Sequence, residues 1–227
     1  MPEQVTTQAM PTHEAWTVAG AFHQGGPVMY IILLIGLGTI FIILDRFKTL
    51  GKLVINKQEF NETLFGMIVS GQIRQAITFC DSKLTPLTNT MKAGLVQALN
   101  KRSDEEVQVA MDAVVLRETP RFEGWVGFLA VFGNLATLTG LLGTIFGMIT
   151  SFRSVYEEKD AVKKAEILSK GIAEALNCTA FGLFVAILAI LAYGYFQVKI
   201  SRAVNDMVES SMSLMNLVAS NRDKIKD

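Results

Sequence analysis

Three long stretches without a single Asp, Glu, Lys or Arg constrain this chain more than any other feature. They cover residues 24–44, 124–152 and 175–198, which are 21, 29 and 24 residues long. A helix needs about 20 residues to cross the hydrocarbon core of a bilayer, so each stretch is long enough to span a membrane. The hydrophobic content of 50% and the mean hydropathy of +0.35 agree with this. We therefore exclude an ordinary soluble single domain.

The distribution of Lys and Arg predicts the orientation of three spans, which we place at residues 27–44, 126–152 and 172–198. Residues 45–123 and the tail after the third span together hold 16 Lys and Arg, whereas residues 153–171 hold 5 and residues 1–26 hold none. Lys and Arg accumulate in the cytoplasmic loops of membrane proteins. We expect an N-terminal segment 1–26 outside, a cytoplasmic insert 45–125, an outer loop 153–171 and a cytoplasmic tail 199–227.

The insert shows helical patterns throughout. Thr85-Pro86 and the Ser103–Glu106 pair are typical helix starts, a cap followed by proline and a capping box. Pro120 should kink or restart a helix ahead of the second span. No run alternates with a period of two for long, so we expect no sheet. The tail keeps the helical pattern, which indicates that the third span continues as one long helix. The predicted fold class is an all-α membrane protein with three transmembrane helices, long cytoplasmic extensions and a helical insert.

The second and third spans each carry one face of small and hydroxylated residues, spaced three and four apart. Small residues let helix backbones approach closely, and hydroxyl groups in a membrane need a partner or water. One interpretation is helix packing, with each hydroxyl bonded to a carbonyl one turn earlier. The other is a polar-lined interface or pore. The two faces consist of Gly133, Thr137, Gly140, Thr144, Gly147 and Ser151, and of Ala175, Thr179, Gly182, Ala186, Ala189 and Tyr193.

Glu174 is the carboxylate at the membrane edge of the third span, and Asn177 and Cys178 follow one turn further in. Glu174 is either an interfacial glutamate favoured by the positive end of the helix or part of an ion pathway. No other charged residue lies within the spans, so this chain cannot relay a proton across the membrane alone. It requires water in a pore or a carboxylate from a partner.

Other chemistry finds no support in the sequence. Lys plus Arg and Asp plus Glu balance at 21 each, so there is no basic excess for nucleic acid. His13 and His23 lie far from Cys80 and Cys178, so we expect no metal site. We also expect reduced cysteines, no cofactor and no catalytic residue. A cleaved signal peptide is not expected, because the first 26 residues lack Lys and Arg. The chain should not be an enzyme.

Two sequence motifs lie on the predicted second and third spans. The second-span motif is Gly140-Leu-Leu-Gly-Thr-Ile-Phe-Gly147, followed by Met148, Ser151 and Phe152. The third-span motif is Gly171-Ile-Ala-Glu-Ala-Leu176, followed by Thr179-Ala-Phe-Gly-Leu183 and Val185-Ala-Ile187. Thr85-Pro86-Leu87 with Ala93-Gly94-Leu95 looks like a weaker cytoplasmic signature. These motifs resemble those of the ExbB/TolQ family of proton-channel subunits, which are related to the flagellar stator protein MotA. The resemblance covers nearly the whole chain.

The resemblance implies a pentameric assembly in the bacterial inner membrane, with segments 1–26 and 153–171 in the periplasm. A dimeric, single-span ExbD/TolR-like partner would occupy the central pore and supply the aspartate that takes up protons. Proton flow would energise a TonB- or TolA-like periplasm-spanning protein, and membrane lipid would surround the ring. The expected ion-pathway residues are Thr144, Thr179, Glu174, Thr137 and Ser151. The expected packing or partner-contact residues are Gly140, Gly143, Gly147, Asn177, Gly182, Ala186 and Tyr193.

The chain departs from the family pattern at three positions. Leu188 stands where proline is usual, Gly194 where asparagine is usual, and Thr137 where proline is common. A related gliding-type motor subunit, or a structural adaptor that conducts no ions, stays an alternative. The sequence leaves open the process that is powered, the choice between protons and sodium, and the number of subunits.

Overall fold

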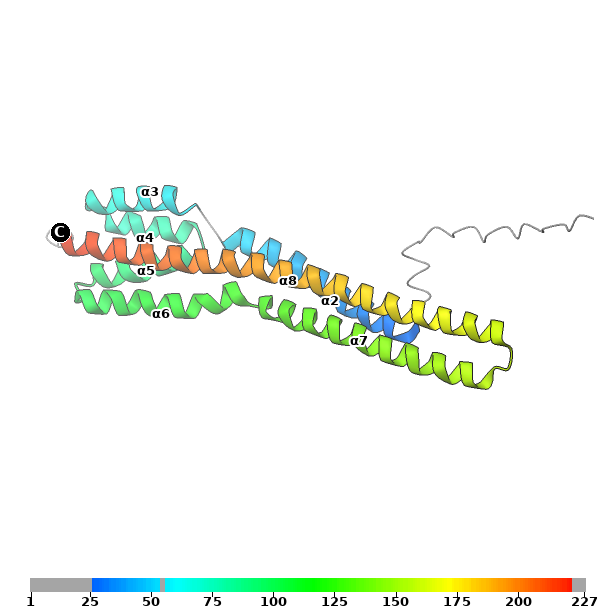
Figure 1. The fold of residues 1–227 in the computed structure, drawn as a ribbon. Helices are drawn as coiled ribbons and strands as arrows, with labels where there is room; N and C mark the ends of the chain where they lie inside the picture. Colours follow the sequence, from blue (N-terminus) through cyan, green and yellow to red (C-terminus); the bar gives the residue numbers. More distant parts are fainter. Residues whose placement is uncertain (1–25, 54–55, 222–227) are drawn as a thin grey trace, which may run out of the picture. The chain divides into compact units, whose positions relative to one another are not determined.

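The protein is helical in a computed structural model that describes residues 26–53 and 56–221 (Figure 1). No β-strand occurs within those two ranges, as the sequence predicts. The expected N-terminal segment, with His13 and His23, lies outside the described residues. The helices are α2 (Gly26–Leu53), α3 (Lys57–Val69), α4 (Ile73–Ser82), α5 (Pro86–Leu99), α6 (Asp104–Glu123), α7 (Val126–Glu157) and α8 (Ala161–Ser220).

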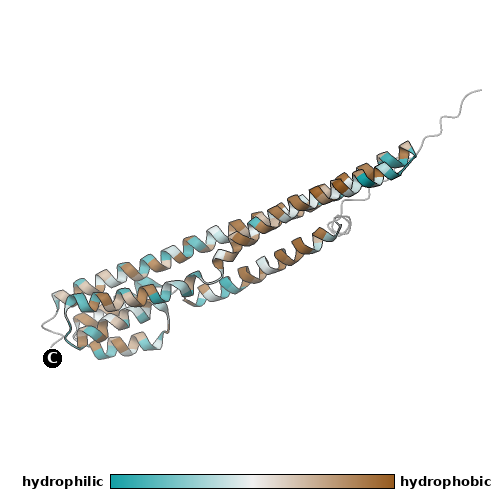
Figure 2. Ribbon diagram, turned by 90° about the horizontal axis from the view of Figure 1, so that it is seen from below, coloured by the Kyte–Doolittle hydropathy of each residue, from teal (hydrophilic) through white to brown (hydrophobic). Residues whose placement is uncertain are grey.

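Three helical stretches are long and apolar enough to cross a membrane. They lie within Gly26–Val69, Asp104–Glu157 and Ala161–Ser220, with mean hydropathies of 2.6, 1.7 and 2.3. Figure 2 shows hydrophobic residues along the long helices, whereas the short helices mix hydrophobic and hydrophilic positions. The prediction of three membrane-spanning helices is confirmed. The prediction that the third span continues into the tail is also confirmed, because α8 is one helix of 60 residues.

The helices around the predicted outer loop are longer than the spans. α7 ends at Glu157 and α8 begins at Ala161, so only residues 158–160 of the expected loop 153–171 are not helical. Charged residues end a membrane span without ending a helix, and Arg153 and Glu157 form an i,i+4 ion pair at 3.7 Å. The start of α8 is marked by Asp160, whose Oδ1 accepts a hydrogen bond of 2.9 Å from the Val162 amide.

The chain divides into two compact units, to each of which α2, α7 and α8 contribute residues. The first, here called the membrane unit, contains the residues up to Thr39 and Phe132–Leu188. The second, the insert unit, contains Ile40–Val131 and the residues from Ala189 onward. Each is described by itself below.

In the insert unit the helix starts follow the sequence signals closely. Ser103 and Glu106 form a reciprocal capping box at the start of α6, with the Glu106 amide donating to Ser103 Oγ at 3.3 Å. Thr85 caps α5, whose first residue is Pro86, and its box partner is Thr88. Both patterns satisfy amide groups that have no partner inside the helix.

Helices α5 and α6 are joined by a buried carboxylate. Glu118 is 2% exposed. Its Oε1 accepts a hydrogen bond of 3.2 Å from the Asn89 side chain on α5, and its Oε2 lies 2.6 Å from Arg121 Nη1. Arg117 adds a longer contact at 3.7 Å. A buried charge is tolerated because it has these partners.

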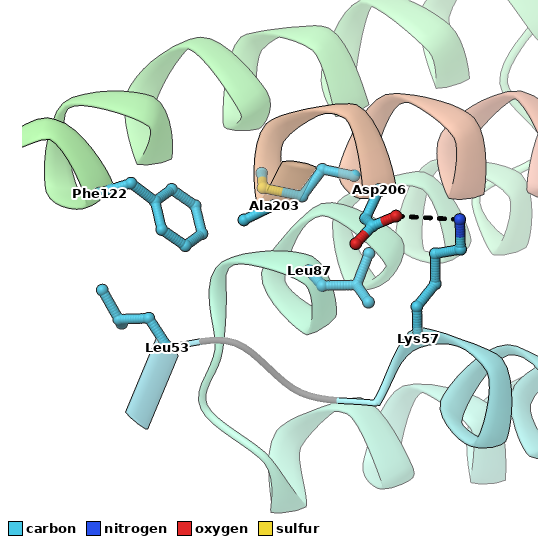
Figure 3. A pocket seen from close by; sticks show the side chains of 7 residues that line it. Leu53, Lys57, Leu87, Phe122, Ala203 and Asp206 are labelled. Atoms are coloured by element: carbon cyan, nitrogen blue, oxygen red, sulfur yellow. Dashed lines mark ion pairs between the residues drawn. The ribbon is translucent and has the colours of Figure 1, made fainter. Parts of the chain in front are cut away.

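Lys57 attaches the start of α3 to α8. Its Nζ lies 2.7 Å from Glu209 Oε2 and 3.0 Å from Asp206 Oδ1. The hydrogen bonds that Lys57 donates to Glu209 and then to Asp206 raise its pKa above the ordinary value. Figure 3 shows the lysine reaching Asp206 beside a small apolar cavity, which is lined by Leu53, Leu87, Phe122, Ala203 and Met207.

Pro120 does not restart a helix. α6 runs through it to Glu123, and the break falls at Gly124, whose φ is +37°. Pro120 lies near the end of α6, and its carbonyl accepts the Gly124 amide at 2.9 Å. A Cβ atom at Gly124 would collide with the guanidinium of Arg46, so the break requires glycine both for its backbone angle and for space.

Candidate functional site

In the membrane unit the small-residue faces of α7 and α8 pack against each other. Residues later in α7 contact residues earlier in α8, so the two helices pack antiparallel. The close approaches pair Ala136 with Gly182, Gly140 with Thr179 and Gly182, Gly143 with Cys178, Gly147 with Ala175, and Ser151 with Gly171. The two faces that the sequence predicts therefore meet inside one chain.

The glycines make this contact possible. A Cβ atom added at Gly140 would lie 3.2 Å from the carbonyl oxygen of Cys178, and one added at Gly182 would lie 2.6 Å from that of Ala136. One at Gly147 would lie 3.1 Å from the Cβ of Ala175. Most of these neighbours are backbone or Cβ atoms, which cannot rotate away. Close backbone approach, rather than polarity, explains the glycines.

Three of the four hydroxyls bond back along their own helix. Thr137 donates to the Gly133 carbonyl at 3.1 Å, Thr144 to that of Leu141 at 2.6 Å, and Ser151 to that of Gly147 at 2.7 Å. Ser151 is buried, Thr144 is half-buried and Thr137 is exposed. The glycines thus occupy the centre of the face, and Thr137 and Thr144 lie toward its open edge.

Thr179 is the hydroxyl that bonds across the interface. Its Oγ1 donates to the Gly140 carbonyl of α7 at 3.2 Å. This hydrogen bond joins positions 39 residues apart in the sequence, and it adds a polar contact where glycine lets the two backbones approach closely.

Glu174 opens on a cavity between α2, α7 and α8. The cavity has a volume of about 440 Å³. It is lined by Pro27, Val28, Ile31, Gly143, Phe146, Gly147, Thr150, Glu174 and Cys178. The side chain of Glu174 is half-buried, and a Cβ atom at Gly26, the first residue of α2, would collide with its Oε1. The carboxylate therefore lies at the positive end of α2.

Not all the expected residues belong to this arrangement. Gly140, Gly143, Gly147, Gly182 and Ala186 are buried, and Asn177 is half-buried. Tyr193 is part of the insert unit, so it is not assigned to this site. The sequence missed the contribution of α2, whose residues carry no polar signal, and Gly171, which continues the α8 face by one more step of four.

Among the described residues that line the cavity, Glu174 is the one carboxylate. The other lining groups are the Thr150 hydroxyl, which is bonded to the Phe146 and Gly147 carbonyls at 2.9 Å, and the Cys178 thiol. Glu174 can hold one proton or attract one cation, but the lining residues that the structure describes include no second carboxyl group to receive a proton from it. A transfer across the membrane would need an acceptor from elsewhere.

Comparison with known proteins identifies the family. The model of the MotA/TolQ/ExbB proton channel family matches residues 82–209, which is more than half of the chain. The chain is 39% identical over 95 residues to the Tol-Pal system protein TolQ of Pseudomonas aeruginosa, a match that covers 42% of this chain and 40% of that protein. The chain thus spans less than half the length of this relative.

A longer sequence match and a solved structure are consistent with this family. A putative biopolymer transport protein ExbB homolog of Methanothermobacter thermautotrophicus is 26% identical over 201 residues, covering 88% of this chain and 70% of that protein. The solved structure of C. jejuni MotAB aligns with a TM-score of 0.58 at 15% identity, over 89% of this chain and 80% of that one. The latter likeness shows the fold. From the family match and the three apolar helices together, we conclude that this chain is a membrane protein of the MotA/TolQ/ExbB proton channel family.

Proposed function

We propose that this protein is the channel subunit of a motor in the bacterial inner membrane that is driven by the proton motive force. An ExbD/TolR-like partner with a single span would lie in the pore of a homo-oligomer, a pentamer by analogy, and would transmit the energy to a TonB- or TolA-like protein. The observation that supports this most is the family match over residues 82–209, which includes α7, α8 up to Glu209 and both small-residue faces.

In the proposed proton path, the membrane unit would supply one carboxylate and the partner would supply the other. We assign Thr144, Thr179 and Glu174 to the pathway, with Thr137 and Ser151 as further candidates. Thr137 and Thr144 donate to carbonyls of their own helix but lie at the open edge of the packed face, where a partner helix can reach them. Thr179 donates across to the Gly140 carbonyl of α7, and Ser151 is buried. Glu174 offers one proton site, and the partner's carboxylate would supply the other. Each proton gains about 2.3 kcal/mol per 100 mV of membrane potential, so several protons could move a partner.

The test measures proton uptake by vesicles that contain the chain with a co-purified ExbD/TolR-like partner. Thr144→Val and Glu174→Gln should each lower the potential-driven uptake at least about tenfold, the effect of roughly 1.4 kcal/mol on a barrier. Matched controls are Thr139→Val, on α7 outside the small-residue face, and Glu166→Gln, an exposed carboxylate two turns before Glu174 on α8. Full uptake by both test variants would contradict the proposed pathway.

A structural adaptor is the second candidate, favoured by the way the two small-residue faces are already filled by each other within one chain. It predicts that the same substitutions alter only the stability of the purified protein. Native mass spectrometry separates the two candidates, because the motor should retain two copies of the partner per ring and the adaptor should assemble without it.

A further inference from the structure

In the insert unit, aromatic rings of α2 and α8 meet where both helices leave their apolar spans. Phe47 lies three residues after the first charge-free stretch ends, and Tyr195 lies three residues before the third one ends. The Phe47 ring centroid is 5.7 Å from that of Tyr195 and 5.1 Å from that of Phe196. Both helices therefore reach the membrane surface at the same level. Phe47 and Tyr195 are exposed by 53% and 46%.

Four exposed cations lie within two turns beyond these rings: Lys48 and Lys52 on α2, and Lys199 and Arg202 on α8. The Nζ of Lys199 lies 5.0 Å from the centroid of the Tyr195 ring. On α8, Tyr195, Lys199 and Arg202 are spaced four and three apart, which places them on one face. Gly51, one turn after Phe47, has open space around its position.

The neighbouring carboxylates do not neutralise these cations. Asp45 pairs with Arg46 at 3.0 Å, and Asp206 and Glu209 pair with Lys57. None of the four cations forms an ion pair within 4.0 Å among residues 26–53 and 56–221. Exposed cations of both helices thus follow the aromatic contact within two turns, just beyond the ends of the charge-free stretches.

We propose that this surface binds the phosphate headgroup of an anionic phospholipid, with Lys199 and Arg202 of α8 and the lysines of α2 around the phosphate and the acyl chains along Phe47 and Tyr195. Basic surfaces between membrane helices on the cytoplasmic side attract such lipids, and aromatic rings are favoured at this depth. The site is separate from Glu174 and holds whether or not the chain conducts protons.

The test counts lipids on the full-length protein in detergent by native mass spectrometry, with phosphatidylglycerol and phosphatidylcholine of the same acyl chains added in turn. The unaltered protein should prefer phosphatidylglycerol. The double variant K199Q/R202Q should lose about thirtyfold in affinity for it, which is what two cations contribute near a charged surface, and should bind phosphatidylcholine unchanged.

Two further variants make the result specific. K163Q/K170Q removes two exposed lysines from the other end of α8 and should keep the preference. The charge-conserving K199R/R202K should also keep it, which attributes the preference to positive charge. Unchanged binding of phosphatidylcholine by K199Q/R202Q excludes misfolding as the cause of its loss. The proposal is overturned if the two lipids bind equally, if K199Q/R202Q retains the preference, if the control double variant loses it to the same extent, or if inorganic phosphate at 10-fold excess displaces the lipid completely.

Discussion

At the scale of single residues, the atoms next to each glycine decide whether a side chain can be added. Gly182 and Gly127 illustrate the two extremes. A Cβ atom at Gly182 would meet backbone atoms of Ala136 and Gly140, whereas nothing lies within 4 Å of such an atom at Gly127. The same glycine-to-alanine change should therefore have opposite effects at the two positions.

We predict that Gly182→Ala destabilises the protein by about 1–3 kcal/mol, because α7 and α8 must separate to admit the methyl group. Gly127→Ala should be neutral or stabilising by up to about 1 kcal/mol, because alanine is the better helix former. Thermal unfolding in detergent compares them. Equal unfolding temperatures for the two variants would show that the close contact contributes nothing.

A second residue prediction concerns Cys80, which is 2% exposed in the insert unit. Burial, followed by the nearby charge of Asp81, raises the pKa of its thiol to about 12. Because the thiolate is the reactive form, alkylation at pH 8 should be about a thousandfold slower in the folded protein than in the unfolded protein. Peptide mapping of Cys80 after timed exposure to iodoacetamide measures this.

The same shift predicts how stability depends on pH. Above pH 9 the unfolded chain loses the Cys80 proton while the folded chain keeps it, until about pH 12. The contribution of the protonated Cys80 thiol to the free energy of unfolding should therefore be complete below pH 9. Above pH 9 it should fall by up to about 1.4 kcal/mol per pH unit. Cys80→Ala should lack this part of the decline.

At the scale of elements, capping side chains fix where the insert helices begin. Ser103 and Glu106 satisfy each other's amide groups, with the Ser103 amide donating to Glu106 Oε2 at 3.0 Å. The signal was readable because it depends on residues three apart. The end of α6 could not be predicted in this way, because Pro120 is the stronger local signal. Glycine is needed at position 124 because the side chain of Arg46, 78 positions earlier, lies against it.

We predict that Ser103→Ala lowers the free energy of unfolding by about 1 kcal/mol through loss of the cap. Thr78→Ala is the control, because Thr78 is exposed inside α4 and its hydroxyl donates to the Arg74 carbonyl of its own helix. Its effect should stay within about 0.5 kcal/mol. Urea unfolding in detergent gives both values, and a cap variant as stable as the control would contradict the prediction.

At the scale of the whole molecule, the unequal distribution of Lys and Arg predicts the orientation in the membrane. Lys163 of α8 should face the periplasm, and Lys101, between α5 and α6, should face the cytoplasm. The test replaces Cys80 and Cys178 by alanine, introduces Lys163→Cys or Lys101→Cys, and treats intact cells with a maleimide that cannot cross membranes.

Cysteine at 163 should react in intact cells, and cysteine at 101 should react only after the cells are permeabilised. Both residues are exposed, so access to the compartment decides the outcome. Reaction at 101 in intact cells would reverse the proposed orientation, and with it the side from which the proposed lipid site is reached.

The sequence by itself determined the three spans, the helix starts at Thr85 and Ser103, the continuation of α8, and the small-residue faces. All of these depend on apolar length or on spacing within one helix, which are local properties of the chain. The tertiary structure decided that the two faces pack on each other, that Thr179 bonds to the Gly140 carbonyl, and that Glu174 lies against the first turn of α2. A helical pattern states which residues share a face, but the partner of that face is chosen by the fit of backbone and side-chain shapes from distant segments.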